Sequence, residues 1–338
     1  MANDTANPIK VLSIDGGGIR GIIPAVILDA LQQRVGKAAH ETFDLIAGTS
    51  TGGIITVGIG TACNQGKPYA PQELVELYVK SGAAIFKKTF FETLKELGGP
   101  KYSPDGLEAV LEKYFGDTQF NTALTPLLVS SYDLQSQLPF FFKSHKIWGN
   151  PKYNWLVREI ARATSAAPTY FPPFHLVRGE EDYALVDGGV FVNNPAMAAY
   201  VEARKLYPNA EKVIVVSVGT GDRQDKITYD AAKGWGLIGW AKNIVPVLMD
   251  SVSEAVDYEL EYLPECTYHR LQLKGLSQSA ADMDNVTPEN IANLQAAASK
   301  YVEIEKNGEL AKLAVALKDG RGSNMPGTGP EAAKGAPA

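Results

Sequence analysis

The feature that most constrains this chain is a buried strand, a glycine-rich turn and a helix that follow one another twice near its start. Apolar residues 11–14 lead into a turn at 16–21 and then an apolar helical stretch at 22–35. Residues 43–47 lead into a second turn and a helix at 51–61. Because each helix carries the chain back for another strand, this pattern predicts a mainly parallel α/β sheet covered by helices on both faces.

The same alternation continues toward the C-terminus. We expect strands over residues 11–14, 43–47, 127–132, 140–144, 184–186, 213–218 and 269–273. We expect helices over residues 22–35, 51–61, 72–81, 104–114, 154–164, 195–205 and 292–306.

Ser50 occupies the second turn, in the pentapeptide Gly48-Thr49-Ser50-Thr51-Gly52. A serine at a sharp strand-to-helix turn projects its Oγ out of the fold, and the start of the following helix favours a developing oxyanion. A chain with 32 glycines also produces such pentapeptides by chance, so a structural turn with a spectator serine stays open on this motif alone.

Three consecutive glycines, Gly16, Gly17 and Gly18, fill the first turn. Their N–H groups can form a nest for an anion, either a phosphate or a tetrahedral oxyanion. Residues 16–21 also fit a degenerate dinucleotide fingerprint. That alternative is the weaker one, because no acidic residue ends a second strand about 20 residues further on.

Asp187 ends the apolar run 184–186 and precedes Gly188 and Gly189. An aspartate at the end of a strand can reach out of a sheet, although an ordinary Asp-Gly turn has the same sequence.

Together these motifs resemble the signatures of the patatin-like phospholipase family. Residues 11–21, 48–53 and 187–189 carry its three main signatures, and residues 99–107 and 163–173 resemble two further segments. The likeness extends from about residue 10 to about residue 315. It implies a lipid acyl hydrolase with a Ser-Asp dyad, on a three-layer α/β/α fold related to cytosolic phospholipase A2.

By this resemblance Ser50 is the nucleophile, Asp187 is its base, and Gly16, Gly17 and Gly18 form the oxyanion loop. Arg20 has three open roles: it locks the glycine loop, it attracts a lipid head group, or it forms a surface salt bridge.

The four histidines favour a dyad, since only His269 follows Asp187 and it lies in an alternating strand pattern with no turn to present it. His175 could approach the site from a loop, but an ordinary packing role is the simpler interpretation. An isolated aspartate titrates near ~3.9, so we expect activity on a short ester to persist down to about pH 5.

No metal or other cofactor is expected, because Cys63 and Cys266 lie far apart without companion ligands. The implied substrates are phospholipids, lysophospholipids or galactolipids, and a net charge of -6 disfavours nucleic acid. Two other functions stay open. One is a storage or binding protein on the same scaffold, and the other is an acyltransferase that uses the same dyad.

One domain is expected over residues 9–317, between a flexible start at 1–8 and a disordered tail at 318–338 rich in Gly, Pro and Ala. Residues 1–8 lack the features of a signal peptide, and the uncharged stretch 45–66 is too polar for a membrane span. We therefore expect a cytoplasmic or otherwise soluble protein. Contact with a membrane surface is left open through residues 85–97 or 235–240, where core packing is the alternative.

Overall fold

The computed structural model describes residues 8–87, 99–224 and 227–318. The flexible start expected before residue 8 and the tail expected after residue 318 lie outside these residues, as does most of the 85–97 segment.

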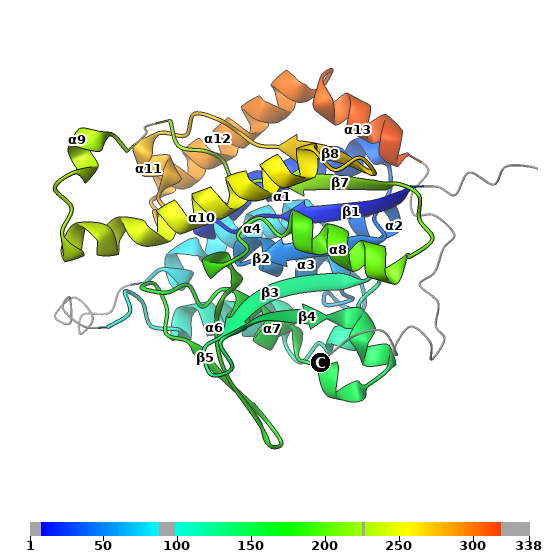
Figure 1. Cartoon of the computed structure of the whole chain (residues 1–338), viewed down its shortest axis with the longest axis horizontal. Helices are drawn as coiled ribbons and strands as arrows, with labels where there is room; N and C mark the ends of the chain where they lie inside the picture. The colour runs from blue at the N-terminus through cyan, green and yellow to red at the C-terminus, as the bar shows by residue number, and fades with distance from the viewer. Residues whose placement is uncertain (1–7, 88–98, 225–226, 319–338) are drawn as a thin grey trace, which may run out of the picture.

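The described residues contain one mixed sheet in the order β5-β6-β3-β2-β1-β7-β8, with β4 paired to β3 (Figure 1). Strands β3, β2, β1, β7 and β8 are parallel, whereas β4, β5 and β6 join antiparallel at one side. The strands are β1 (Ile9–Ile14), β2 (Leu45–Thr49), β3 (Leu127–Asp133), β4 (Leu138–Lys143), β5 (Phe174–Arg178), β6 (Glu181–Asp187), β7 (Val213–Val218) and β8 (Cys266–Leu271).

The helices cover both faces of this sheet. They are α1 (Ile22–Val35), α2 (Ala39–Thr42), α3 (Thr51–Gly60), α4 (Pro71–Ile85), α6 (Asp105–Phe115), α7 (Val157–Thr164), α8 (Ala196–Leu206), α9 (Tyr229–Ala232), α10 (Leu237–Glu261), α11 (Gln278–Ala281), α12 (Pro288–Glu305) and α13 (Glu309–Leu317).

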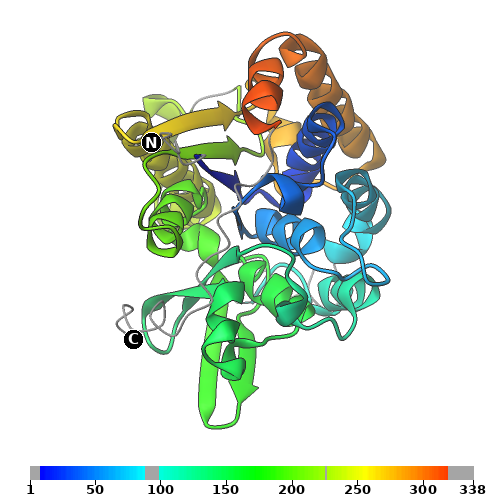
Figure 2. The same cartoon turned by 90° about the vertical axis from the view of Figure 1, so that its right-hand side faces the viewer.

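Alternate residues of the strands divide the core into two layers. Ile9 and Val11 of β1 share one cluster with residues of α8 and α10. Leu12 and Ile14 point the other way, into a larger cluster with α1, α3, α4 and α12. Figure 2 shows the sheet between these two groups of helices, which confirms the expected three-layer α/β/α architecture.

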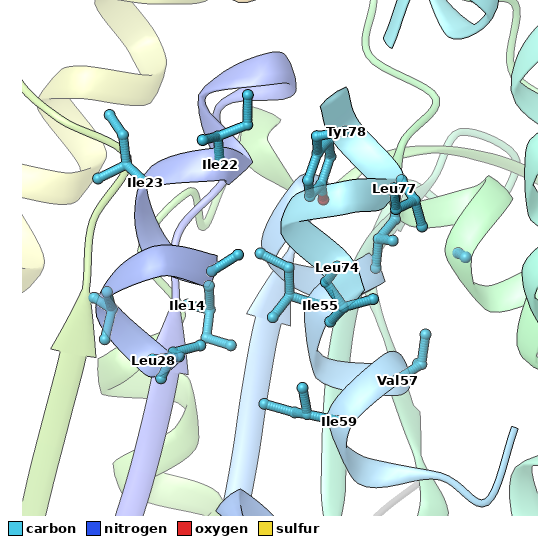
Figure 3. Packing of buried hydrophobic residues seen from close by; sticks show 14 of the residues in the cluster. Ile14, Ile22, Ile23, Leu28, Ile55, Val57, Ile59, Leu74, Leu77 and Tyr78 are labelled. Atoms are coloured by element: carbon cyan, nitrogen blue, oxygen red, sulfur yellow. The ribbon is translucent and has the colours of Figure 1, made fainter. Parts of the chain in front are cut away.

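Helix α3 explains the uncharged stretch at 45–66. Every residue of α3 is buried, so the helix has no solvent-facing side on which a charge could be placed. Figure 3 shows Ile55 of α3 between Ile14 of β1 and Leu74 of α4. Complete burial of such a side chain contributes about 1.5–3 kcal/mol. None of the described helices is both long enough and apolar enough to cross a bilayer.

Six elements were not expected from the sequence: the short helices α2, α9 and α11, and the longer elements β5, α10 and α13. Helix α10 was missed because Gly239 and Pro246 interrupt its pattern, and both residues normally weaken a helix interior. The helix continues through both, with Met249, Val256 and Leu260 of its later turns buried in the protein.

Candidate active site

Ser50 lies at the junction between β2 and α3, as the sequence predicted. Its backbone has φ 55° and ψ −124°, a conformation that few non-glycine residues adopt. The turn is compact, since a Cβ on Gly52 would lie 2.1 Å from the carbonyl oxygen of Ile14. The N–H of Ser50 donates to Oγ1 of Thr164 in α7 at 2.8 Å, which fixes the turn.

Asp187 reaches the same place from an antiparallel strand. In the register of the sheet, Thr49 pairs with Ser130 of β3, and the next residue, Ser131, pairs with Asp187 of β6. Asp187 therefore lies one residue further along β3 than the position paired with the end of β2. Like Ser50, Asp187 stands at the C-terminal end of its strand, but β6 runs antiparallel to β3 and therefore reaches this place from the direction opposite to β2.

Burial dominates the electrostatics of Asp187. Its side chain is fully buried, and this raises its pKa to about 7, while hydrogen bonds from Ser50 and Gly189 oppose the rise. The Gly189 N–H donates to Oδ1 at 2.8 Å. Within the described residues Oδ2 has no hydrogen bond of standard geometry, so the contact with the Ser50 hydroxyl is a loose one, as is common before substrate binds.

This pKa corrects one expectation. A carboxyl that titrates near 7 does not remain a base down to about pH 5. The expectation was wrong because it used the value of an isolated aspartate and omitted desolvation.

The glycine loop offers fewer free donors than expected. The N–H of Gly16 donates to the carbonyl of Asn193 at 3.1 Å and is therefore occupied. The N–H groups of Gly17 and Gly18 have no acceptor among the described residues. Gly18 has φ +60°, and a Cβ there would lie 2.2 Å from the carbonyl oxygen of Met283. Thr51 provides another N–H without an acceptor, which sequence reasoning missed although it directly follows Ser50.

Arg20 lies inside the protein and braces the glycine loop. Its Nε donates to the carbonyl of Gly17 at 3.3 Å, and Nη1 donates to that of Gly221 at 3.0 Å. Burial lowers the pKa of this guanidinium. A buried side chain held by two carbonyls fits the loop-locking role, and neither the head-group contact nor the surface salt bridge.

A narrow apolar pocket of about 50 Å³ adjoins Ser50 and Gly18. Most of its lining is hydrophobic and comes from α3, α4, α6 and α10 and from the segment that follows α7. The lining includes Ile54, Ile85, Phe86, Leu107, Phe171 and Met249.

A buried ion network lies behind the glycine loop. Arg270 of β8 donates to Oδ2 of Asp15 at 2.7 Å and pairs with Asp257 of α10 at 3.1 Å. Asp257 in turn accepts from the side chain of Asn194 at 2.9 Å. Burial raises the pKa of Asp15 to about 6, and Arg270 opposes the rise. The network joins the residue before Gly16 to the loop after Asp187, and no local sequence signal connects its members.

The histidines lie elsewhere. His269 of β8 pairs with Glu309 at 2.5 Å, and β1 and β7 separate its strand from β2. His175 forms an exposed pair with Asp182 at 2.8 Å, and so it is not packed in the core. No histidine lines the pocket within the described part of the chain.

The chain matches the model of the family described as patatin-like phospholipase over residues 12–200, a range that contains both Ser50 and Asp187. It belongs to this family. It is 33% identical to patatin-like protein 2 of Arabidopsis thaliana, over 84% of this chain and 80% of the relative. It is 30% identical to a Solanum tuberosum protein named probable inactive patatin-3-Kuras 1, over 84% of this chain and 83% of that protein.

Among solved structures, human GIVD cytosolic phospholipase A2 in complex with methyl gamma-linolenyl fluorophosphonate aligns with a TM-score of 0.43. The alignment covers 92% of this chain and 60% of that one, at 14% identity. A similarity at this level carries no argument about function. Since one relative is named as inactive, membership of the family does not establish activity, and the residues of the site must decide it.

Proposed function

We propose that this patatin-like protein is a lipid acyl hydrolase in which Ser50 attacks carboxylic esters and Asp187 is the base. The observation that carries the proposal is the serine at a strained strand-to-helix turn beside a buried carboxyl whose pKa is raised to about 7. A carboxylate of that basicity accepts a proton more readily than an ordinary aspartate does at neutral pH.

In the first step the Ser50 Oγ attacks the ester carbonyl and its proton passes to Asp187. The N–H groups of Gly17, Gly18 and Thr51 stabilise the oxyanion, and the loss of one such donor costs about 3 kcal/mol. As the tetrahedral intermediate collapses, the leaving alcohol takes the proton from Asp187. Water then attacks the acyl-serine, gives its proton to Asp187, and the fatty acid leaves as Ser50 recovers that proton.

The apolar pocket is suited to the acyl part of the substrate. Its 50 Å³ is well below the roughly 300–1,000 Å³ of sites that enclose drug-sized ligands, so a long acyl chain must displace side chains or extend out of the pocket. Met249 and Met283 line the pocket and adapt readily, because methionine is unbranched. Phospholipids, lysophospholipids and galactolipids share this acyl group, and the activity is of the phospholipase A or lysophospholipase type.

Two alternatives use the same scaffold. A storage or binding protein would hold lipid without turnover. An acyltransferase would form the same acyl-serine and pass the acyl group to an alcohol in place of water.

The test is a digest of mixed phospholipids and galactolipids, with Ser50→Ala as the control and with the site of a serine-reactive phosphonate located by peptide mass spectrometry. We expect free fatty acid only from the parent, and the label on Ser50. Ser165 is the competing nucleophile, since it lines the same pocket. Its Oγ has no hydrogen-bond partner among the described residues, so nothing there accepts its proton. Label on Ser165, or fatty acid release by Ser50→Ala, would refute the assignment.

A further inference from the structure

Helix α10 carries an exposed apolar stripe along its N-terminal half. Leu237, Trp240, Ile244 and Leu248 are 89%, 46%, 36% and 42% exposed. Their spacing of three or four residues places them on one face, roughly opposite the buried Met249 and Ser253. An aligned set of large exposed apolar side chains marks an interaction surface more often than single ones do.

The stripe lies next to the pocket. Met249, the residue after Leu248, lines the pocket beside Ser50. Figure 1 shows α9 and the start of α10 extending together beyond the sheet. On α9 and just before it, Tyr229 and Ile227 are also exposed. The helix therefore contributes one face to the pocket and another to the surrounding solvent.

The charges near the stripe select the partner. The four stripe residues carry no charge, and Lys242 of the same helix half falls at a helical position on the far side from them. Nearby Lys233 is paired with Asp230 at 2.7 Å. The second half of α10 is acidic, with exposed Glu254, Glu259 and Glu261. Such a surface offers apolar area but no excess positive charge. We therefore expect it to bind an anionic membrane no more tightly than a neutral one.

We propose that Leu237, Trp240, Ile244 and Leu248 dock this protein onto a zwitterionic lipid surface and so bring the pocket to its substrate. The choice of lipid as the occupant rests on the proposed function, because the ester substrates lie in such a surface. A tryptophan at the stripe fits this location, since its ring is favoured at the boundary between apolar and aqueous phases.

The experiment measures partition onto phosphatidylcholine vesicles by flotation, in a Ser50→Ala background so that hydrolysis does not alter the vesicles. The test variant is Leu237→Gln with Trp240→Gln. The control is Trp148→Gln, which removes a tryptophan of similar exposure, 58%, from a 3-10 turn at Ser144–Trp148. We expect partition to fall at least about tenfold in the test variant and to be unchanged in the control. Partition should also be insensitive to salt.

Three results would overturn the proposal: no partition by the parent, equal partition by parent and test variant, or partition that is lost at high salt. If the stripe instead holds two copies of the chain together, the parent will be a dimer in solution and the test variant a monomer. That result would also overturn the proposal. Hydrolysis of a water-soluble ester, measured with Ser50 intact, is a separate readout. If the parent does not hydrolyse that ester, the proposed function is refuted. If the stripe variant hydrolyses it at the parent's rate, the site of the variant is folded.

Discussion

Replacement of Asp187 by asparagine tests the electrostatic consequence of burying this carboxyl group. Burial raises the pKa of this carboxyl from 3.8 to about 7. At about 1.36 kcal/mol per pKa unit, the folded state disfavours the ionised form by about 4 kcal/mol. Because the folded pKa lies above the unfolded one, the protonated carboxyl stabilises the fold fully below about pH 4, and this contribution is lost as the pH rises through about 7.

Asparagine stays neutral and keeps the oxygen that accepts the Gly189 N–H. We therefore expect Asp187→Asn to be more stable than the parent by up to about 4 kcal/mol at about pH 8, and no more stable at about pH 4. For a chain of 338 residues this corresponds to a Tm about 5 °C higher, which thermal unfolding followed by circular dichroism across this pH range will detect.

The control is Asp133→Asn, at another buried aspartate. Its carboxylate accepts the N–H groups of Gln135, Ser136 and Ala184, so an amide there places donor against donor and should lower the Tm at about pH 8. If parent and Asp187→Asn show the same dependence of Tm on pH, the desolvation argument is refuted.

Three further substitutions test other parts of the site. Gly18→Ala should lower kcat/KM at least about 100-fold, because the new Cβ collides with a backbone oxygen. The control Gly36→Ala, with φ +76° but open space around it, should lower the free energy of unfolding by about 1 kcal/mol and leave kcat/KM unchanged. Equal kcat/KM values for Gly18→Ala and the parent would remove the loop from the mechanism. Arg270→Leu should lower the free energy of unfolding by about 3–5 kcal/mol in urea titration, since Asp15 and Asp257 would lose their buried partner; a change below about 1 kcal/mol would show that the network does not hold the site. His269→Ala should keep kcat/KM within about twofold of the parent, because its partner is Glu309, and a loss of about 100-fold or more would restore a histidine mechanism.

The parts of this site that the sequence predicts are the local ones. Ser50 and Gly18 follow from a strand, a turn and a helix that are contiguous in the chain, and their backbone conformations are set within a few residues. The order of these units also predicted the parallel centre of the sheet, because each crossover is short.

What the sequence could not provide depends on distant segments. The pKa of Asp187 depends on every group that excludes water from it, and the occupied N–H of Gly16 depends on the carbonyl of Asn193. Arg270 joins Asp15 from the opposite end of the chain. Helix α10 was missed because Pro246 lowers its local propensity, which tertiary contacts of its buried face outweigh.

The most direct test of a serine activated by aspartate alone is the pH dependence of kcat/KM for a water-soluble ester, measured at two temperatures in the parent and in His269→Ala. A midpoint near 7 fits an imidazole as well as Asp187, so the midpoint alone does not identify the base. The ionisation of a carboxyl hardly changes with temperature, whereas that of an imidazole shifts to lower pH on warming. We predict activity that falls as the pH drops through about 7, with the same midpoint at both temperatures and in both proteins. A midpoint that moves down on warming, together with its loss in His269→Ala, would contradict the account.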